Sequence, residues 1–141
     1  MPDSDQIVSP DELAFAARFR VALHRFNAET ETVVRECGLT TSRYVLLLII
    51  QAEADAGREA TVSTVAEQLQ LSHNTVSELV SRATEAGLLH RERTPSDRRS
   101  SRLSLTEEGR RRLVNAVARL SGERAALGRI IRRRPAGRQG V

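Results

Sequence analysis

Polar side chains that can bond to nucleic acid gather between residues 72 and 82, in a segment predicted to be a short helix. An asparagine amide can bind adenine through two hydrogen bonds, and serine or threonine hydroxyls can meet bases or phosphates. The helix is capped by Ser72, and its exposed side is expected to carry His73, Asn74, Thr75, Ser77, Glu78, Ser81 and Arg82. By itself this could be a polar face in water, but the helix-turn-helix and hairpin predicted around it favour contact with DNA.

Two further groups of residues could contact phosphate. Ser63 and Thr64 begin the preceding predicted helix, where backbone N–H groups and the helix dipole attract anions. Asp97, Arg98 and Arg99 lie in a polar, turn-prone segment, and an arginine can grip phosphate through two hydrogen bonds. The alternative for the second group is a charged loop with no fixed partner.

The residues that catalysis or metal binding would need are not arranged for either. We find no glycine-rich phosphate loop, nucleophile motif or catalytic pair of carboxylates, so we expect no enzyme and no cofactor. His24 and His90 lack a second ligand at a useful spacing, so we expect no metal site. Cys37, the single cysteine, lies on an apolar stripe and is expected to be an inert core residue rather than a redox sensor.

The composition is that of one compact domain, or of one small module with long helices attached: 141 residues, 40% hydrophobic and 28% charged. Only 3% of the residues are aromatic, which argues against binding of single strands through stacked bases. The longest apolar run, Tyr44–Ile50, is too short to span a bilayer, and the first residues lack the pattern of a secretory leader. We therefore expect a cytoplasmic protein with no membrane partner.

Charge is divided unevenly along the chain. All 22 basic residues are arginine, for which we favour a GC-rich genome as the reason over the alternative, selection for phosphate binding. Residues 1–81 hold 6 arginines and 12 acidic residues, whereas residues 82–141 hold 16 arginines and 6 acidic residues. A basic half beside an acidic half indicates a polyanionic partner.

A long first helix is predicted over residues 10–38. Ser9 and Glu12 have the spacing of a capping box, and Gly38 suits the C-terminal end. Apolar residues between Ala16 and Cys37 recur at steps of three and four, which makes one stripe along about 42 Å of helix. A monomer of this size has trouble burying such a stripe, so we expect this helix to pack on a partner chain.

The middle of the chain, residues 39–105, is predicted to be a winged helix-turn-helix. A wholly apolar helix that begins at Thr40 or Thr41 should be the hub of the core, buried on every side. Ser63 is expected to cap a short helix over 64–69, and a second helix should run from Ser72 to about residue 86. The apolar contacts between these two helices are expected from Val65, Leu69, Leu71, Val76 and Leu79. Strands over 88–94 and 102–105 should form a hairpin, the wing.

The remaining segments complete the predicted domain organisation. Thr106 is expected to cap a C-terminal dimerisation helix over 106–134, with a bend near Ser121 and Gly122 because glycine weakens a helix interior. Residues 1–9 and 135–141 are expected to be flexible. The predicted fold is mainly α with a small β-hairpin wing. It is a winged helix-turn-helix flanked by two long dimerisation helices, an N-terminal one over 10–38 and a C-terminal one over 106–134.

Four stretches of the sequence carry a resemblance to a known family. They are LSHNTVS (71–77), GLLHR (87–91), DRRS (97–100) and LSLTEEG (103–109). Together with the order of the predicted elements, they resemble the MarR family of bacterial transcription regulators over roughly residues 10–132. Gln70 departs from the glycine that many helix-turn-helix motifs have in the turn, so this turn must tolerate a side chain.

The resemblance implies a homodimeric repressor that binds a pseudo-palindromic operator in double-stranded DNA. Asp97 would orient the wing, Arg99 would enter the minor groove, and Arg98 would contact phosphate or solvent. It also implies release from DNA by a small lipophilic or phenolic effector, in a pocket that we place near Leu23, Leu47 and Arg43 or Arg91. The alternative function is a winged-helix module for protein contact or for sequence-independent DNA binding.

Overall fold

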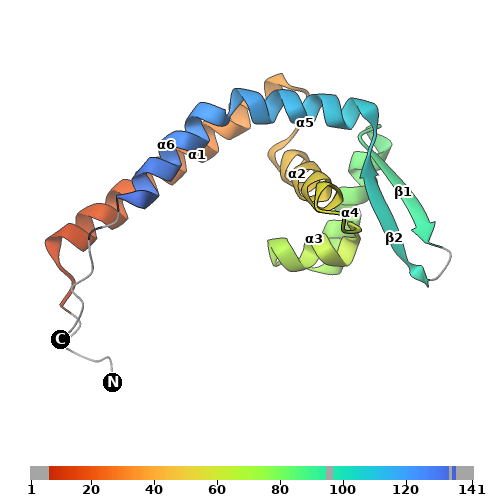
Figure 1. Ribbon diagram of the computed structural model, residues 1–141, viewed down its shortest axis with the longest axis horizontal. Coiled ribbons are helices and arrows are strands. Elements are labelled where there is room, and N and C mark those ends of the chain that lie inside the picture. Colours follow the sequence, from red (N-terminus) through yellow and green to blue (C-terminus); the bar gives the residue numbers. More distant parts are fainter. Residues whose placement is uncertain (1–6, 95–96, 134, 136–141) are drawn as a thin grey trace. The chain divides into compact units, whose positions relative to one another are not determined.

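A computed structural model describes residues 7–94, 97–133 and 135, and it leaves the side chains of residues 94 and 97–100 undescribed. The described elements, labelled in Figure 1, are α1 (Pro10–Glu36), α2 (Thr41–Asp55), α3 (Val62–Leu69), α4 (His73–Glu85), β1 (Leu89–Thr94), β2 (Asp97–Leu105), α5 (Glu107–Arg119) and α6 (Ser121–Arg132). The fold is therefore mainly helical with a small hairpin, as the sequence predicts. The chain divides into two compact units, one formed by residues 31–119 and the other by the residues on either side of them.

Helix α2 is the hub of the unit formed by residues 31–119. It packs against α3, α4, α5 and β2, and the side chains of Leu46, Leu47 and Ile50 have no exposed surface. Thr40 is its N-cap, because the Thr40 hydroxyl accepts a hydrogen bond from the backbone N–H of Arg43. The prediction that α2 is buried on every side is wrong at Leu48, which is 38% exposed.

Helices α3 and α4 form the helix-turn-helix. Val65 and Val76 are fully buried between the surrounding elements, but Leu71 is exposed and so contributes less to this core than the sequence predicts. The turn between the helices places Gln70 in the left-handed region, with φ 54° and ψ 41°. A side chain there costs about 1–2 kcal/mol, which explains why such turns favour glycine.

The cap of α3 is one of the corrections to the sequence prediction. Thr61, and not Ser63, is the N-cap: its hydroxyl accepts a hydrogen bond from the N–H of Thr64 at 3.2 Å. The Thr64 hydroxyl accepts in turn from the N–H of Thr61 at 3.4 Å, which completes a capping box. Ser63 therefore lies within the first turn of α3, and the helix starts two residues earlier than predicted.

The hairpin is longer than the predicted strands. Antiparallel pairing runs from Leu89 and Leu105 to Arg93 and Ser101, then shifts register so that Thr94 pairs with Asp97. Residues 97–101 were predicted as loop because they are polar, but backbone pairing across the hairpin outweighs that local preference. A third segment joins the sheet at Ala60, whose carbonyl accepts a hydrogen bond from Leu103 at 2.8 Å.

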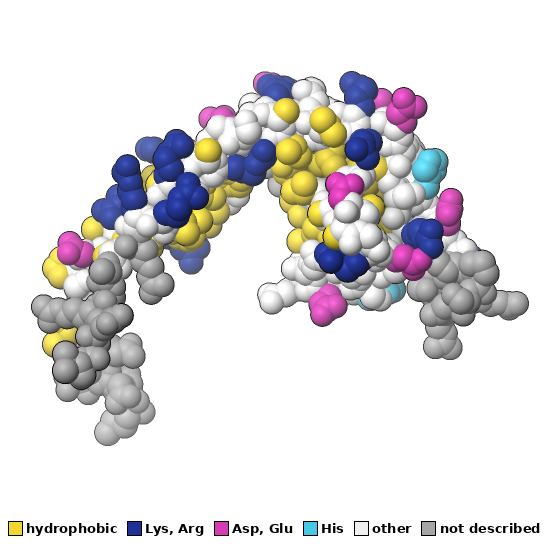
Figure 2. All heavy atoms as spheres, viewed as in Figure 1, with side chains coloured by type: hydrophobic (Ala, Val, Ile, Leu, Met, Phe, Trp, Pro, Cys, Tyr) yellow, Lys and Arg dark blue, Asp and Glu magenta, His cyan; other side chains and the backbone are white. Residues whose placement is uncertain are grey.

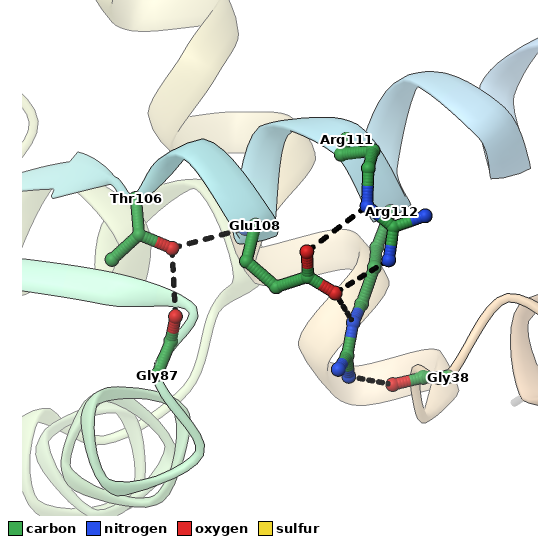
Figure 3. A network of polar contacts seen from close by, with 7 residues as sticks. Gly38, Gly87, Thr106, Glu108, Arg111 and Arg112 are labelled. Atoms are coloured by element: carbon green, nitrogen blue, oxygen red, sulfur yellow. Dashed lines mark hydrogen bonds and ion pairs between the residues drawn. The ribbon is translucent and has the colours of Figure 1, made fainter.

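The start of α5 is bonded to the turn that precedes β1, where Thr106 contacts Gly87 (Figure 3). The hydroxyl of Thr106 accepts a hydrogen bond from the N–H of Gly109 at 3.0 Å and donates one to the carbonyl of Gly87 at 2.7 Å. A Cβ atom at Gly109 would lie 2.2 Å from the carbonyl oxygen of Leu88. The spacing Thr-x-x-Gly is therefore explained by two local needs, a cap and a close backbone approach.

In the other unit, α6 lies beside α1 (Figure 1). The predicted capping box at the start of α1 is present, with the N–H of Ser9 donating to the Glu12 carboxylate and the N–H of Glu12 donating to the Ser9 hydroxyl. The helix predicted over 106–134 is divided into two, α5 and α6, which separate at Leu120, next to the bend predicted near Ser121 and Gly122.

The apolar stripe of α1 is only partly covered within this unit. Phe15 and Phe19 contact each other, with ring centroids 6.3 Å apart, and both remain half-buried. Leu13 is 62% exposed and Ile131, on α6, is 49% exposed. Hydrophobic side chains are visible on the surface along these two helices in Figure 2. A hollow of about 510 Å³ is lined by Val8, Glu12, Leu13, Phe15, Ala16, Phe19, Ile131 and Pro135.

Candidate nucleic-acid interface

Helix α4 presents a polar face because its apolar residues all point to one side. Val76, Val80 and Ala83 are completely buried, which leaves the opposite side of the helix in solvent. The exposed candidates on this helix and its cap are Ser72, His73, Asn74, Thr75, Ser81 and Arg82, while Ser77 is half-buried. The structure thus places most of the predicted contact residues on one exposed helix.

The hydroxyls at the start of α4 have structural partners. The Ser72 hydroxyl accepts a hydrogen bond from the N–H of Thr75 at 3.1 Å, and the two side-chain oxygens lie 2.8 Å apart. Ser72 is therefore the N-cap that the sequence predicts. Any contact of these two hydroxyls with DNA must use the lone pairs that the cap leaves open.

The first turn of α3 offers fewer open groups than the sequence suggests. The Thr64 hydroxyl is half-buried and bonded in the capping box with Thr61, whereas Ser63 is exposed. The nearly buried Glu53 carboxylate joins α2 to this helix: it accepts a hydrogen bond from Gln68 of α3 at 3.0 Å and another from the exposed Arg58 at 2.7 Å. Hydrogen bonds from Arg58 and then Gln68 lower the pKa of Glu53 below its usual value.

The wing is attached to the helix-turn-helix by a contact that the sequence did not reveal. Arg102 of β2 forms an ion pair with Glu59, which lies in the segment before α3. Arg102 is also paired across the hairpin with Glu92 of β1. Glu59 and Arg102 are 43 residues apart, so no local pattern could have paired them. Asp97, Arg98 and Arg99 have their backbone in β2, but their side chains lie outside the described part of the chain.

The arginine run at 110–112 is not simply a solvated face. Arg111 and Arg112 both donate to the carboxylate of Glu108, and Arg112 also donates to the carbonyl of Gly38 at 2.8 Å (Figure 3). Hydrogen bonds from Arg111 and Arg112 lower the pKa of Glu108 from 4.5 to about 2. These contacts join the start of α5 to the end of α1, while Arg110 is exposed. A second run of three arginines lies at 132–134; Arg132 and Arg133 are exposed, and Arg134 lies outside the described residues.

The residues suggested for an effector pocket lie in very different surroundings. Leu47 has no exposed surface, Arg43 is half-buried in the first turn of α2, and Arg91 is exposed on β1. Leu23 is half-buried in the other unit. Their role in binding an effector stays a prediction.

Cys37 is buried beside a charged group. It is 8% exposed, and Nη1 of Arg119 lies 3.7 Å from its sulfur, while Arg119 also forms an ion pair with Glu36. Within the described parts of the chain, no three His, Cys, Asp or Glu side chains come together in a way that could hold a metal ion. Among the same residues, no helix is both long and apolar enough to cross a membrane.

A capped helix-turn-helix followed by a two-stranded wing defines the chain as a winged-helix protein. Its residues 38–100 match the sequence pattern of the MarR family. A comparison with curated proteins gave no match.

Solved structures resemble the chain over most of its length. A MarR-family transcriptional regulator from Rhodococcus sp. RHA1 is 27% identical, with 93% of this chain and 86% of that one covered and a TM-score of 0.66. MepR, a transcription regulator of the Staphylococcus aureus efflux pump MepA, is 18% identical, with coverage of 81% and 82% and a TM-score of 0.70. A mutant of MepR, solved bound to an oligodeoxyribonucleotide, is 19% identical, with 82% of each chain covered and a TM-score of 0.63.

The chain therefore has the winged-helix segment and the fold of a MarR-family transcription regulator. This confirms the resemblance that the four sequence motifs indicated.

Proposed function

We propose that this chain is a sequence-specific regulator that binds double-stranded DNA and represses transcription. The observation that carries the proposal is the exposed polar face of α4, where Asn74, Ser81 and Arg82 stand on a helix fixed by its Ser72 cap. A helix of this kind fits the major groove, where the donor and acceptor pattern of each base pair is distinct. The MepR mutant, which has a similar fold, was solved bound to an oligodeoxyribonucleotide, and this supports DNA binding by the fold. We propose no catalytic step, and we place the protein in the cytoplasm with its DNA.

The proposed DNA-binding form is a homodimer. Support comes from the partly covered stripe on α1 and α6, where Leu13 and Ile131 remain exposed beside a hollow of about 510 Å³. Large exposed apolar patches with this character mark surfaces that bind another chain. Two α4 helices related by a two-fold axis would read a pseudo-palindrome with half-sites roughly 34 Å apart.

The proposed effector is a small lipophilic or phenolic acid. Because Leu47 has no exposed surface, an effector that reaches it must move neighbouring side chains. Such a ligand acts by binding one conformation better than another, here a form that holds the two α4 helices at a spacing unfit for DNA. Arg43 or Arg91 would receive its carboxylate or phenolate. The support for this part of the proposal is the family resemblance, and a screen of phenolic acids for operator release tests it.

Selection of bound sequences from a random DNA pool tests the main proposal. We expect one near-palindromic operator, bound at least about 10³-fold more tightly than random DNA. Asn74→Ala should lose much of that ratio, whereas the matched control Asn115→Ala, on an exposed position of α5, should retain it. Equal affinity for every DNA would indicate sequence-independent binding, and no DNA binding at all would indicate a protein-contact module.

A further inference from the structure

The exposed face of α4 contains an acidic side chain at its centre. Glu78 lies one helical turn after Asn74 and one turn before Arg82, on the same side of the helix as both. Its side chain is 64% exposed, and its Oε1 accepts a hydrogen bond from Nη2 of Arg82 at 2.5 Å. A carboxylate is an unexpected choice at this point, because the proposed partner is a polyanion and repels negative charge.

The ion pair between Glu78 and Arg82 does not explain the choice through stability. Both side chains are 64% exposed, and exposed pairs one turn apart on a helix contribute little because water and salt screen them. Any other pair of polar residues would keep the helix in solvent equally well. The carboxylate must therefore be considered for what it can do when DNA lies against α4.

Base chemistry offers one specific use for a carboxylate in the major groove. An ionised carboxylate can only accept hydrogen bonds. In the major groove, cytosine presents only a donor, its N4 amine, whereas adenine presents both a donor and an acceptor. Nη2 of Arg82 donates to Oε1 of Glu78 and so orients the carboxylate, while the second oxygen can accept a hydrogen bond from a base. Wrong bases that present only acceptors are rejected by the same negative charge.

We propose that Glu78 is a specificity-determining residue whose carboxylate reads a cytosine in each operator half-site while Arg82 positions it. This inference rests on the proposed function, because it assumes that α4 lies in the major groove. It makes Glu78 a contributor to sequence choice rather than to affinity. Removing the carboxylate should thus strengthen binding to DNA in general and weaken discrimination at one position.

The test is sequence selection from a random DNA pool with the full-length wild type, Glu78→Ala and Glu78→Gln. We expect a cytosine in each half-site that the wild type selects about tenfold over other bases and that Glu78→Ala no longer selects, with the other positions kept. Glu78→Gln should shift the choice at that position towards adenine, because an amide can pair with both adenine groups. The matched control Glu67→Gln, which makes the same change in charge on an exposed position of α3, should keep the cytosine. Melting temperatures equal to that of the wild type show that the variants are folded.

Two results overturn the inference, and they differ in what else they affect. If Glu78→Ala binds all DNA more tightly but selects the same sequence as the wild type, the carboxylate acts through repulsion alone and reads no base. That result leaves the proposed function intact. If the wild type itself selects no sequence, both the inference and the sequence-specific function are wrong.

Discussion

At the residue scale, Asn74 is expected to act through base readout. Its side chain is exposed near the start of α4, in the turn that follows the Ser72 cap. Asn74→Ala should therefore cost about 1–3 kcal/mol on the operator and little on random DNA, since only a base contact depends on sequence. Affinities for both DNAs, measured at one salt concentration, check this. An equal loss on both would show that Asn74 contacts the backbone instead.

Arg99 is expected to act through charge placed in the minor groove, where A·T and T·A pairs look alike. Arg99→Ala should weaken binding to the operator and to random DNA, most where an A-tract narrows the groove. The logarithm of the affinity falls linearly with the logarithm of the salt concentration. The slope of this line should become less steep by about one unit for each phosphate that the arginine of one chain no longer neutralises. Arg99→Lys should recover only part of the binding, because an ammonium group cannot replace a planar guanidinium. Affinities for operator and random DNA, measured over a series of salt concentrations, test these effects. If Arg99→Ala has the same affinity and salt dependence as the wild type, Arg99 does not contact DNA.

Cys37 is expected to be a structural residue. It is buried just after the end of α1, and Arg119 bonds to Glu36 through Nη2 while its Nη1 lies beside the Cys37 sulfur. Cys37→Ser should leave DNA binding and its response to peroxide unchanged, with some loss of stability from burying a hydroxyl, about 1–3 kcal/mol. Operator binding with and without peroxide tests this for both proteins. Release of the wild type but not of the variant would show that Cys37 senses oxidants.

At the scale of elements, the Glu108 contacts join α5 to the end of α1 and should depend on pH. Because the pKa of Glu108 is lowered to about 2 in the folded protein, its ionised form stabilises the fold above its usual pKa of 4.5. This contribution should be lost as pH falls from about 4.5 to about 2. Glu108→Gln should therefore melt at a lower temperature than the wild type at about pH 6, well above that range, and the difference should shrink in acid. Glu107→Gln, one residue earlier on an exposed position, is the matched control.

The elements that the sequence predicts well are those fixed by neighbours in the chain. The caps at Ser9, Ser72 and Thr106 each depend on a residue three positions away, so their spacing is visible in the sequence. The cap of α3 was misplaced because Thr61 and Ser63 are both good caps and only packing decides between them.

Contacts between distant parts of the chain could not be predicted in the same way. Arg112 bonds to Gly38 and Arg102 pairs with Glu59 across 74 and 43 residues respectively, and no periodic pattern encodes such pairs. The exposed side of α4 was predictable because the buried valines that define it recur at helical spacing. The ion pair between Glu78 and Arg82 has the same local origin, because residues four apart are neighbours on a helix.

At the scale of the whole molecule, the partly covered apolar surface of α1 and α6 predicts a homodimer in solution at micromolar concentration. Within one chain, Leu13 and Ile131 remain exposed at the hollow beside α1 and α6, and burial in a dimer would remove that apolar surface from water. Light scattering should therefore give about twice the chain mass of 15.6 kDa.

The double variant Leu13→Arg with Ile131→Arg should shift the protein towards the monomer, because two charges per chain would have to be buried. Leu71→Arg, at an exposed leucine between α3 and α4, should stay dimeric as the matched control. The monomeric variant should also bind a full operator more weakly than the dimer does, since it places only one α4 helix at a time. A wild-type mass of 15.6 kDa at high concentration would contradict the dimer and, with it, the two-fold operator.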